Sequence, residues 1–370
     1  MTDMGNDART VLTLDAGGTN LVFSAMRGGD EVVAPLTLPS RADALDACLG
    51  QIMEGFSRVR EACPAPPVAI SFAFPGPADY PNGIIGKLGN LPAFCEGNVP
   101  LGPMLEDRFS LPVFINNDGD LFAYGEAMAG FLPWVNERLA EVGSPRRYSN
   151  LFGATLGTGF GGGIVSEGRL FRGDNSLAGE IWLFRDKLHP AGNIEEGVGI
   201  RALRQSYAER TGLAFDATPE PRELFEIATG ERPGPQEAAV GAFHAMAESA
   251  GDALASAATL IDGLVVIGGG LSGAAPVFLA RLVAEMNGRF ETGSGPIARL
   301  AQRAFNLEDP TELETFCRGD AREVTVPGSG RKIVYDLLQR IGVGLSRLGT
   351  SRATSIGAYT FALSALDRKS

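Results

Sequence analysis

Two glycine-rich segments of the chain have the composition of phosphate-binding loops. The first, AGGTN at residues 16–20, follows Asp15, and the second is GTGFGGG at residues 157–163. Successive glycines let backbone N–H groups converge on phosphate oxygens, because no side chain stands in the way. An ionised carboxylate cannot donate a hydrogen bond to phosphate, so the useful role of Asp15 would be to hold Mg²⁺ through water.

Each segment also fits a plain hairpin turn, in which the glycines serve only the backbone geometry. Two such segments between strand patterns, one of them preceded by an acid, favour phosphate binding. A weaker candidate is GGG at residues 268–270, where an adenosine could pack but where a plain strand–helix turn fits as well. The predicted ATP-binding residues are Asp15, Gly17, Gly18, Thr19, Asn20, Thr158, Gly159, Gly268, Gly269 and Gly270.

Asp118 is a candidate general base. It follows Asn117 after a predicted strand at residues 112–115. Phosphoryl transfer to an alcohol needs an acceptor oxygen held in line and a group that takes its proton, and a carboxylate facing a cleft suits that role. The pattern alone favours an alternative, in which Asn117 or Asp118 only caps the following helix.

Strand and helix patterns alternate around these residues. Strands at 11–15 and 21–26 enclose the first glycine segment, and strands at 151–156 and from 164 enclose the second. This repeated hairpin predicts two α/β domains that could close on one ligand. The other predicted elements are helix 42–60, strand 68–74, helix 121–132, a mostly helical region 192–258 with a break at 232–235, strand 264–267, helix 276–286, an irregular stretch 287–332 with a small hairpin (324–326 and 332–335), and helix 350–366.

Composition and charge narrow the class of protein. The 370 residues suffice for two domains, and 44% hydrophobic with 21% charged residues is typical of a globular chain. The net charge of −12 argues against binding to nucleic acid or to anionic membranes. The four cysteines are scattered, and the first ten residues lack the apolar run of a secretory signal. We therefore expect a cytoplasmic protein without a membrane span.

Six motifs together resemble the ROK family of sugar kinases and sugar-responsive repressors. They are LDAGGTN at 14–20, NNDGDLFAYGE at 116–126, GTGFGGGIV at 157–165, AGEI at 178–181, VVIGGGLSG at 265–273 and SRLGTSRATSIGAY at 346–359. The resemblance extends over nearly the whole chain. It implies the actin-like ATPase fold, an α/β fold of two domains with a cleft between them.

The resemblance also implies a domain division. We expect an N-terminal α/β domain over residues 1–117, with the closing helix 350–370 packed back on it, and a C-terminal α/β domain over residues 118–349. The segment 287–335 is longer than the family usually has there. We expect it to be an irregular insertion that serves as a flap or an oligomer contact.

For function, the resemblance implies ATP- and Mg²⁺-dependent phosphorylation of a hexose on its 6-hydroxyl, as in glucokinases and hexokinases, with Asp118 as the catalytic base. It also implies a sugar pocket whose floor is shaped by Gly76 and Pro77. A plain turn residue explains Asn90 equally well, and Glu196 replaces Glu195 if the register slips by one residue. The implied sugar-binding residues are Asn90, Asn117, Asp118, Glu180 and Glu195.

The chain departs from the common family pattern beside Asn117 and Asp118 and again after the AGEI motif. Asn116, Gly119 and Asp120 stand where Glu, Ala and Asn are usual. Leu183 stands at the position of a family His that precedes a zinc-binding cysteine cluster, and residues 188–193 contain no cysteine. A zinc site needs about four N or S ligands, so we expect no zinc. We expect the two histidines, His189 and His244, to be a surface residue and a structural residue respectively.

Alternative functions remain within the same resemblance. The repressor branch carries an added N-terminal DNA-binding domain, and we expect none here because the first glycine segment comes directly after Asp15. A sugar sensor without turnover is disfavoured by Asp118 and both glycine segments. N-acetylglucosamine, N-acetylmannosamine, mannose and fructose stay open as acceptors. Family members are commonly dimers, which implies a homodimer.

Overall fold

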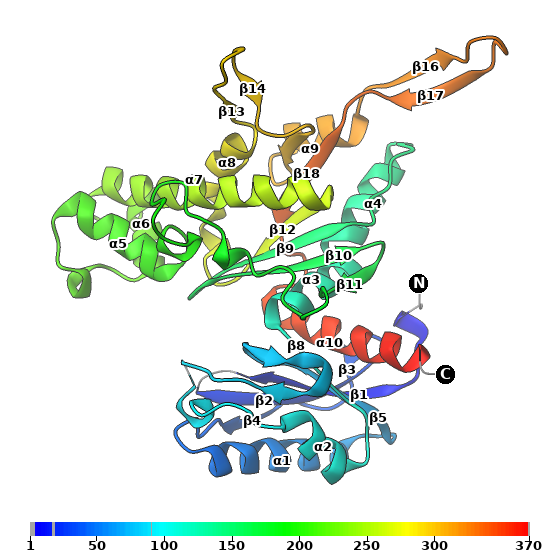
Figure 1. Ribbon diagram of the computed structural model, residues 1–370, viewed down its shortest axis with the longest axis vertical. Coiled ribbons are helices and arrows are strands. Elements are labelled where there is room, and N and C mark those ends of the chain that lie inside the picture. The colour runs from blue at the N-terminus through cyan, green and yellow to red at the C-terminus, as the bar shows by residue number, and fades with distance from the viewer. Residues whose placement is uncertain (1–3, 17–18, 90, 369–370) are drawn as a thin grey trace. The chain divides into compact units, whose positions relative to one another are not determined.

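The chain divides into two compact units. The computed structural model describes residues 4–16, 19–89 and 91–368. The first unit comprises Met1–Gly130, Gly163–Gly179 and Leu348–Ser370, and the second comprises Phe131–Gly162 and Glu180–Arg347. Figure 1 labels most helices and strands of both units.

The first unit is built on a six-stranded sheet. Its strands are β1 (Thr10–Ala16), β2 (Asn20–Arg27), β3 (Asp30–Glu31), β4 (Leu36–Pro39), β5 (Pro67–Ala73) and β8 (Val113–Asn116), while β6 (Ala78–Asp79) and β7 (Ile84–Ile85) form a separate hairpin. The order is β3-β2-β1-β5-β8, with β4 also paired to β2. β1 and β2 form the predicted antiparallel hairpin, whereas β1, β5 and β8 run parallel. The predicted strands are therefore confirmed.

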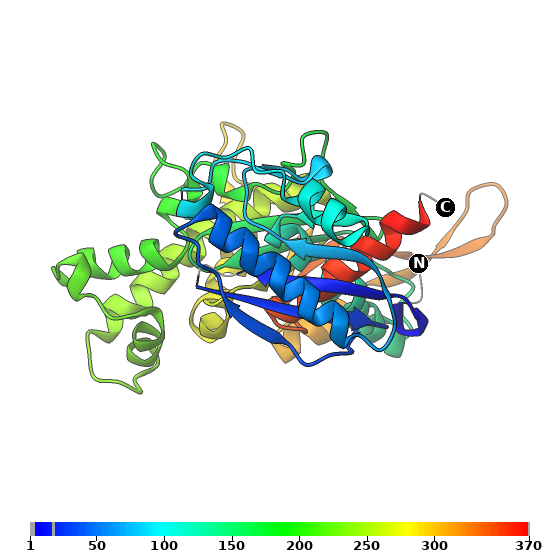
Figure 2. The ribbon, with the colours of Figure 1, turned by 90° about the horizontal axis from the view of Figure 1, so that it is seen from below.

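Helices cover both faces of this sheet (Figures 1 and 2). α1 (Leu45–Ala62) and α2 (Leu101–Phe109) lie on one face, and α10 (Thr350–Asp367) lies on the other with α3 (Asp118–Ala129) packed against it. The backbones of α3 and α10 touch, because a Cβ added at Gly125 would lie 1.8 Å from the Ala353 carbonyl oxygen. Glycine is required at such an approach. The predicted closing helix is confirmed and belongs to the first unit.

One predicted helix has the wrong bounds. In place of a single helix at 121–132, α3 begins at Asp118, and α4 (Phe131–Glu141) starts after a break at Gly130. Gly130 has φ −116° and ψ −113°, which is not helical. The glycine leaves room for Glu126, whose carboxylate would lie 2.2 Å from a Cβ at that position. Leu132, predicted to end the first helix, thus lies in the second.

A second six-stranded sheet has the order β11-β10-β9-β12-β18-β15. Its strands are β9 (Leu151–Leu156), β10 (Phe160–Ser166), β11 (Arg169–Phe171), β12 (Leu264–Gly268), β15 (Arg303–Asn306) and β18 (Arg340–Leu345). Strands β9, β12, β18 and β15 run parallel. The predicted strands 151–156 and 264–267 are confirmed.

The second glycine turn is shorter than predicted. β10 begins at Phe160 rather than Ile164, so three of the seven residues in GTGFGGG form the turn. The turn is closed by a bond from the Gly157 N–H to the Gly159 carbonyl of 3.0 Å. The Phe160 side chain, 1% exposed, anchors the start of the strand in the core.

Helices flank this sheet in the second unit. The predicted helical region consists of α5 (Ile200–Thr211), α6 (Pro221–Thr229) and α7 (Gln236–Ile261), with the predicted break before α7, and α8 (Ala275–Met286) follows β12. A capping box between Glu220 and Glu223 begins α6. Alanines make up most of the buried face of α7, which allows α8 to pack closely on it. These predictions are confirmed.

The segment predicted to be irregular contains regular elements, so that description is wrong. It holds β13 (Arg289–Phe290), β14 (Ile297–Ala298), β15, α9 (Pro310–Arg318) and the hairpin of β16 (Ala321–Thr325) and β17 (Lys332–Asp336). β15 extends the second sheet by pairing with β18, a strand that the sequence did not reveal. The small hairpin is confirmed, and it projects from its unit as an arm (Figure 1).

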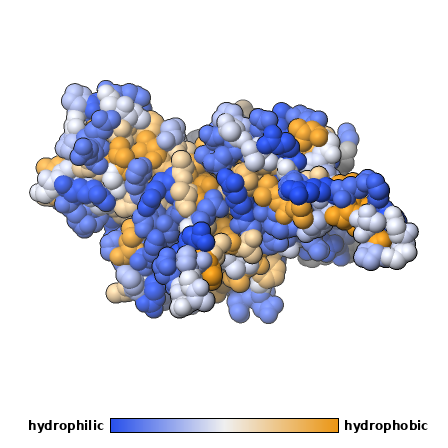
Figure 3. Space-filling model, turned by 90° about the horizontal axis from the view of Figure 1, so that it is seen from above, coloured by the Kyte–Doolittle hydropathy of each residue, from blue (hydrophilic) through white to orange (hydrophobic). Residues whose placement is uncertain are grey.

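Short 3-10 helices complete the fold. The face shown in Figure 3 carries separate hydrophobic patches among hydrophilic residues. Within the part of the chain that the structure describes, no helix combines the length and apolarity that crossing a membrane requires. The 3-10 helices are η1 (Met4–Asn6), η2 (Tyr80–Asn82), η3 (Pro92–Phe94), η4 (Ile181–Leu183), η5 (Ile194–Glu196), η6 (Phe215–Ala217) and η7 (Ser272–Ala274).

Candidate active site

Two predicted carboxylates lie at the same edge of the first sheet. Asp15 is the penultimate residue of β1, and Asp118 follows β8 by two residues. β1, β5 and β8 run parallel, so their carboxyl ends meet at one edge, where open α/β sheets bind ligands. Both side chains are exposed to solvent.

Asp118 has an electrostatic environment suited to a base. Although its side chain reaches solvent, desolvation by surrounding protein atoms raises the pKa of its carboxyl above the ordinary value. The N–H of Gly119, which donates to Asp118 Oδ1 at 2.9 Å, acts in the opposite direction, and the negative charge of Asp15 raises the pKa further. A carboxylate with a raised pKa is a better proton acceptor near neutral pH.

Helix capping falls mainly to Asn117. Asn117 is the N-cap of α3, and its Oδ1 accepts from the Gly119 N–H at 2.8 Å. Its Nδ2 donates to the Tyr80 hydroxyl at 3.4 Å, and that hydroxyl donates to the Phe74 carbonyl at 3.0 Å. A Cβ at Gly76 would lie 2.9 Å from the same hydroxyl. Tyr80 therefore connects Asn117 with Phe74 and lies close to Gly76, a role that no sequence pattern indicated.

The family departures at positions 116 and 120 are buried. Asn116 is 0% exposed and Asp120 2%. Asn116 Oδ1 accepts from Arg172 Nη1 at 3.2 Å, and the Arg172 guanidinium lies 5.0 Å from the Phe361 ring centroid. Burial lowers the pKa of Arg172, and the charge of Asp120 acts in the opposite direction. Asn116 and Asp120 thus flank Asp118 in the chain as part of a buried polar cluster with Arg172, a residue that sequence reasoning missed.

The second sheet carries two predicted glycine loops side by side. β9 and β12 are neighbouring parallel strands in which Gly268 pairs with Thr155. The connections that follow them begin at Gly157 and Gly269 and therefore leave the same edge. A bond from the Leu271 N–H to the Leu156 carbonyl, 3.0 Å, joins the two connections.

Glu195 contacts the 157–159 loop directly. Its Oε1 accepts from the Phe160 N–H at 3.0 Å. A Cβ at Gly159 would lie 2.3 Å from the same oxygen, so the carboxylate occupies space that any other residue would fill. Glu196 is exposed and pairs with Arg201 at 2.8 Å, turned to a different partner. The neighbouring glutamates are thus distinguished by their contacts.

The remaining predicted residues have simpler surroundings. Glu180 is half-buried and its Oε2 accepts from the Trp182 indole N–H. Thr19 and Asn20 are exposed at the start of β2. Leu183, at the position of the family His, is 61% exposed. The predicted residues Gly17, Gly18 and Asn90 lie outside the described residues.

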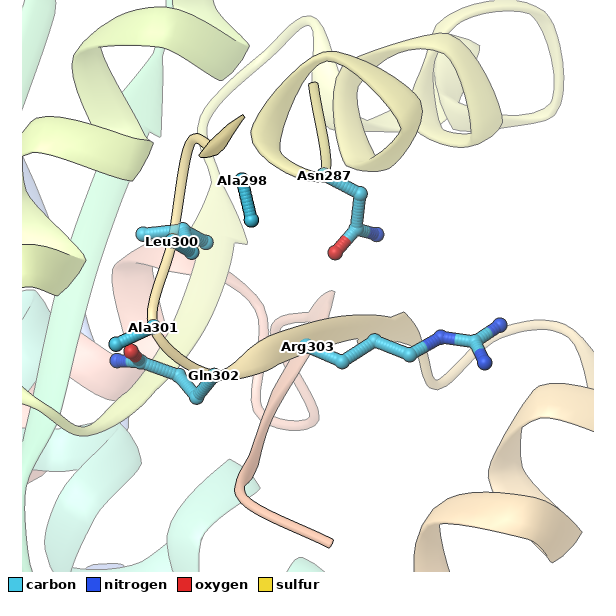
Figure 4. Close-up of a pocket in the computed structure, with 6 residues that line it drawn as sticks. All are labelled: Asn287, Ala298, Leu300, Ala301, Gln302 and Arg303. Atoms are coloured by element: carbon cyan, nitrogen blue, oxygen red, sulfur yellow. The ribbon is translucent and has the colours of Figure 1, made fainter. Parts of the chain in front are cut away.

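Two cavities lie elsewhere in the second unit. One of about 480 Å³ is lined by Asn287, Ala298, Leu300, Ala301, Gln302 and Arg303 (Figure 4). The Asn287 amide is already bonded to the Ala304 N–H and carbonyl. The other, of about 520 Å³, is lined by residues of α5, α7 and the segment 188–197. Neither holds a predicted catalytic residue.

Protein ligands for a metal are sparse. Among residues 4–16, 19–89 and 91–368, no group of three or more His, Cys, Asp and Glu side chains is placed to hold a metal ion. Mg²⁺ in phosphate-transfer sites is held by one or two carboxylates together with substrate phosphates and water. The exposed Asp15 fits that requirement.

Comparison with known proteins identifies the family. A sequence profile described as the ROK family matches residues 11–295. An N-acetyl-D-glucosamine kinase of Vibrio cholerae is 30% identical, over 70% of this chain and 83% of that protein. A crystal structure of a glucokinase from Parabacteroides distasonis has 55% identity and a TM-score of 0.89, covering 98% of this chain and 99% of that one.

A more distant structure supports the fold alone. A ROK glucokinase from Streptomyces griseus, in complex with glucose and AMPPNP, has 20% identity and a TM-score of 0.61, covering 95% of this chain and 98% of that one. The fold of this chain is therefore the predicted actin-like ATPase fold of the ROK sugar kinases. The profile match and the relatives show that the chain belongs to the ROK family.

Proposed function

We propose that the protein is an ATP-dependent sugar kinase that phosphorylates a hexose on its 6-hydroxyl. One observation carries this proposal: Asp118 is solvent-exposed at the carboxyl edge of the first sheet, with a raised pKa, while Asn117 takes over the capping of the helix. The Asp118 carboxylate is therefore available for proton transfer. The similarity to a glucokinase at 55% identity supports glucose as the first acceptor to test.

In the proposed reaction Asp118 accepts the proton of the sugar 6-hydroxyl. The oxygen then forms a bond to the γ-phosphorus of ATP, the bond between that phosphorus and the bridging oxygen breaks, and ADP leaves. A positioned base contributes a factor on the order of 10²–10⁴ to such a step. The larger share of the rate comes from positioning and from neutralising the phosphate charge.

We assign the phosphate groups of ATP to the backbone N–H groups of the glycine segments, with the hydroxyls of Thr19 and Thr158. The loops after β9 and β12 would receive the nucleotide in the second unit, since they leave the same sheet edge. Asp15 would hold Mg²⁺ through water. Bound Mg²⁺ would supply charge neutralisation on the phosphate oxygens.

We assign the sugar hydroxyls to Asn117, Glu180 and Glu195, with Asn90 as a further candidate. The contact of Glu195 with Phe160, and the pairing of Glu196 with Arg201, favour Glu195 over its neighbour. Asparagine and glutamate side chains can satisfy many hydroxyl patterns. N-acetylglucosamine is therefore the second candidate acceptor, supported by the Vibrio cholerae relative.

The test is release of ADP from ATP and Mg²⁺ in the presence of single sugars. We expect glucose or N-acetylglucosamine to give turnover and the product to carry phosphate on the 6-hydroxyl, as identified by NMR. A sugar sensor would bind the sugar, detected by calorimetry, without releasing ADP. That result would overturn the proposal.

We further infer a homodimer in the cytoplasm and a closing helix from residue 350. The proposed domain boundary near residue 117 falls just before α3, which the first compact unit includes through Gly130. Family membership supports the dimer, and the packing of α10 on β1 and β5 supports the role of the closing helix. Sedimentation at several protein concentrations tests the dimer. A single monomer boundary at all concentrations would contradict it.

A further inference from the structure

The two glutamates assigned to the sugar stand at either end of one short loop. Phe184 and Ile194 are joined by a bond from the Ile194 N–H to the Phe184 carbonyl of 2.7 Å. Arg185 and Asn193 form an antiparallel bridge. This bond and this bridge close residues 184–194, called here the 184–194 loop, so that its two ends lie side by side. Whatever fixes this loop also fixes the chain on which Glu180 and Glu195 are carried.

A buried carboxylate fixes the loop to the body of the unit. The Asp186 side chain is 0% exposed. Its Oδ1 accepts from the Ser249 hydroxyl of α7 at 2.6 Å and from the Leu188 N–H at 3.2 Å. Its Oδ2 lies 2.5 Å from His189 Nδ1. Burial of a carboxylate is unfavourable unless such partners compensate it, so a single defined position is imposed on the loop.

The chain on the other side of Glu195 is shaped around the same carboxylate. A Cβ at Gly197 would lie 2.5 Å from Ser249 Oγ and 2.7 Å from Asp186 Oδ2. Residue 197 must therefore be glycine for the carboxylate to stay where it is. Asp186 thus constrains the backbone both before and after Glu195.

The trio is not a hydrolytic triad. In such triads the imidazole lies between the nucleophile and the carboxylate. Here Asp186 lies between Ser249 and His189, so the serine hydroxyl donates to the carboxylate and not to the imidazole. His189 is 59% exposed and holds the outer oxygen of the carboxylate. The surface histidine expected from the sequence is therefore a partner of a buried acid.

We propose that Asp186 is a positioning residue for sugar binding, acting through the 184–194 loop with Ser249 and His189 as its supports. The proposal rests on the proposed function, because it assigns Glu180 and Glu195 to the sugar. Without the carboxylate the loop loses its buried contact with α7 and keeps the exposed pair of Lys187 with Glu248. Both glutamates then move from the sugar hydroxyls, while Asp118 and the glycine loop after β12 keep their own supports.

The test compares Asp186→Asn and Ser249→Ala with wild type in steady-state kinetics. We expect KM for the accepted sugar to rise at least about 10-fold in Asp186→Asn and less in Ser249→Ala, a loss of about 1.4 kcal/mol or more in the first case. KM for ATP should rise less, by about threefold at most, because Glu195 contacts the loop after β9 whereas the loop after β12 keeps its own bond to the Leu156 carbonyl. Asp216→Asn removes an exposed carboxylate of the same unit and serves as the matched control.

His189 provides a second, gentler test. The amide nitrogen of Asn occupies the place of the imidazole Nδ1, so His189→Asn keeps a donor for Asp186, whereas His189→Ala removes it. We expect His189→Asn to bind sugar as wild type does and His189→Ala to raise KM for the sugar. Both substitutions are at an exposed position and leave the core intact.

The outcomes separate the two proposals. If wild type phosphorylates no sugar, the proposed function fails. If wild type is active and the variants change KM for sugar and KM for ATP equally, or change neither, Asp186 has only a structural role and the positioning proposal fails. Circular dichroism and the melting temperature show whether Asp186→Asn is folded. If it is not, the pair His189→Asn and His189→Ala decides.

Discussion

The carboxyl edges of the two sheets present different chemistry. At the first, the side chains of Asp15 and Asp118 are exposed, and the negative charge of Asp15 raises the pKa of the Asp118 carboxyl. At the second, the loops consist largely of glycine backbone, and the half-buried carboxylate of Glu195 accepts a hydrogen bond from the Phe160 N–H at the end of one of them. In the proposed reaction, proton transfer therefore depends on charge at the first edge, and phosphate binding depends on shape at the second. We expect a substitution that changes charge at constant shape to lower turnover at the first edge, and one that adds volume without charge to weaken ATP binding at the second.

The largest expected effect is from Asp118→Asn, which removes charge and keeps shape. We expect turnover to fall at least about 10²-fold, because the base is lost, while the sugar still binds. Steady-state kinetics and calorimetry measure the two quantities. Asp107→Asn, an exposed position in α2, is the control and should behave as wild type. Near-normal turnover of Asp118→Asn would remove it from the role of base.

Gly159→Val tests the opposite property, since it adds volume without charge. A Cβ there would lie 2.3 Å from Glu195 Oε1, so the loop must shift. We expect KM for ATP to rise roughly 10-fold or more, the equivalent of about 1.4 kcal/mol. KM for the sugar should rise with it, because Glu195 is displaced.

The control for this variant is Gly293→Ala, where an added Cβ has no atom within 4 Å. It should leave both KM values unchanged. If Gly159→Val retained the ATP dependence of wild type, the loop after β9 would not be a phosphate-binding element.

Arg172→Met tests the buried polar cluster of Asn116, Asp120 and Arg172 that flanks Asp118. The substitution removes the bond to Asn116, which is fully buried, and leaves a polar group without its partner. We expect a loss of about 1–3 kcal/mol in the free energy of unfolding and a fall of a few-fold in turnover. Chemical denaturation and kinetics measure these. An unchanged free energy of unfolding would show that this cluster does not stabilise the carboxyl edge of the first sheet.

The pH dependence should follow the raised pKa of Asp118. The base acts when ionised, so kcat/KM should fall as the pH decreases through a pKa above the ordinary value of 3.8. Removing the nearby negative charge in Asp15→Asn lowers that pKa, and the acid limb should move to lower pH. The shift should be less than about one pH unit, since solvent screens both groups. A shift toward higher pH would contradict the proposed coupling.

The smallest effect is expected from Lys187→Gln. Lys187 pairs with Glu248 at 2.9 Å and Glu285 at 2.7 Å, yet its side chain is 38% exposed. Such ion pairs contribute about 1 kcal/mol or less. Thermal unfolding should show a small decrease that vanishes at high salt. A large rise in KM for the sugar would mean that surface pairs, and not Asp186, hold the 184–194 loop.

Local sequence patterns predicted much of the fold. Strands such as 151–156 and 264–267, and the helices at 276–286 and 350–366, have periodicity and flanking glycines that a single segment already displays. The same holds for Asp15 and Asp118 at strand ends, because parallel strands place their carboxyl ends together. β15 and β18 escaped prediction, because β18 contains two glycines, which weaken a strand pattern, and β15 is a four-residue edge strand that pairs with β18.

The sequence alone thus determined many of the longer elements, the glycine segments and the family. Only the tertiary structure decided the partners of the buried polar groups. Phe160 and Glu195 are 35 residues apart, Asn116 and Arg172 are 56 apart, and Asp186 and Ser249 are 63 apart. The physical reason is that turns and periodicity follow from the local backbone, whereas a buried hydrogen bond exists only where packing brings two distant segments together.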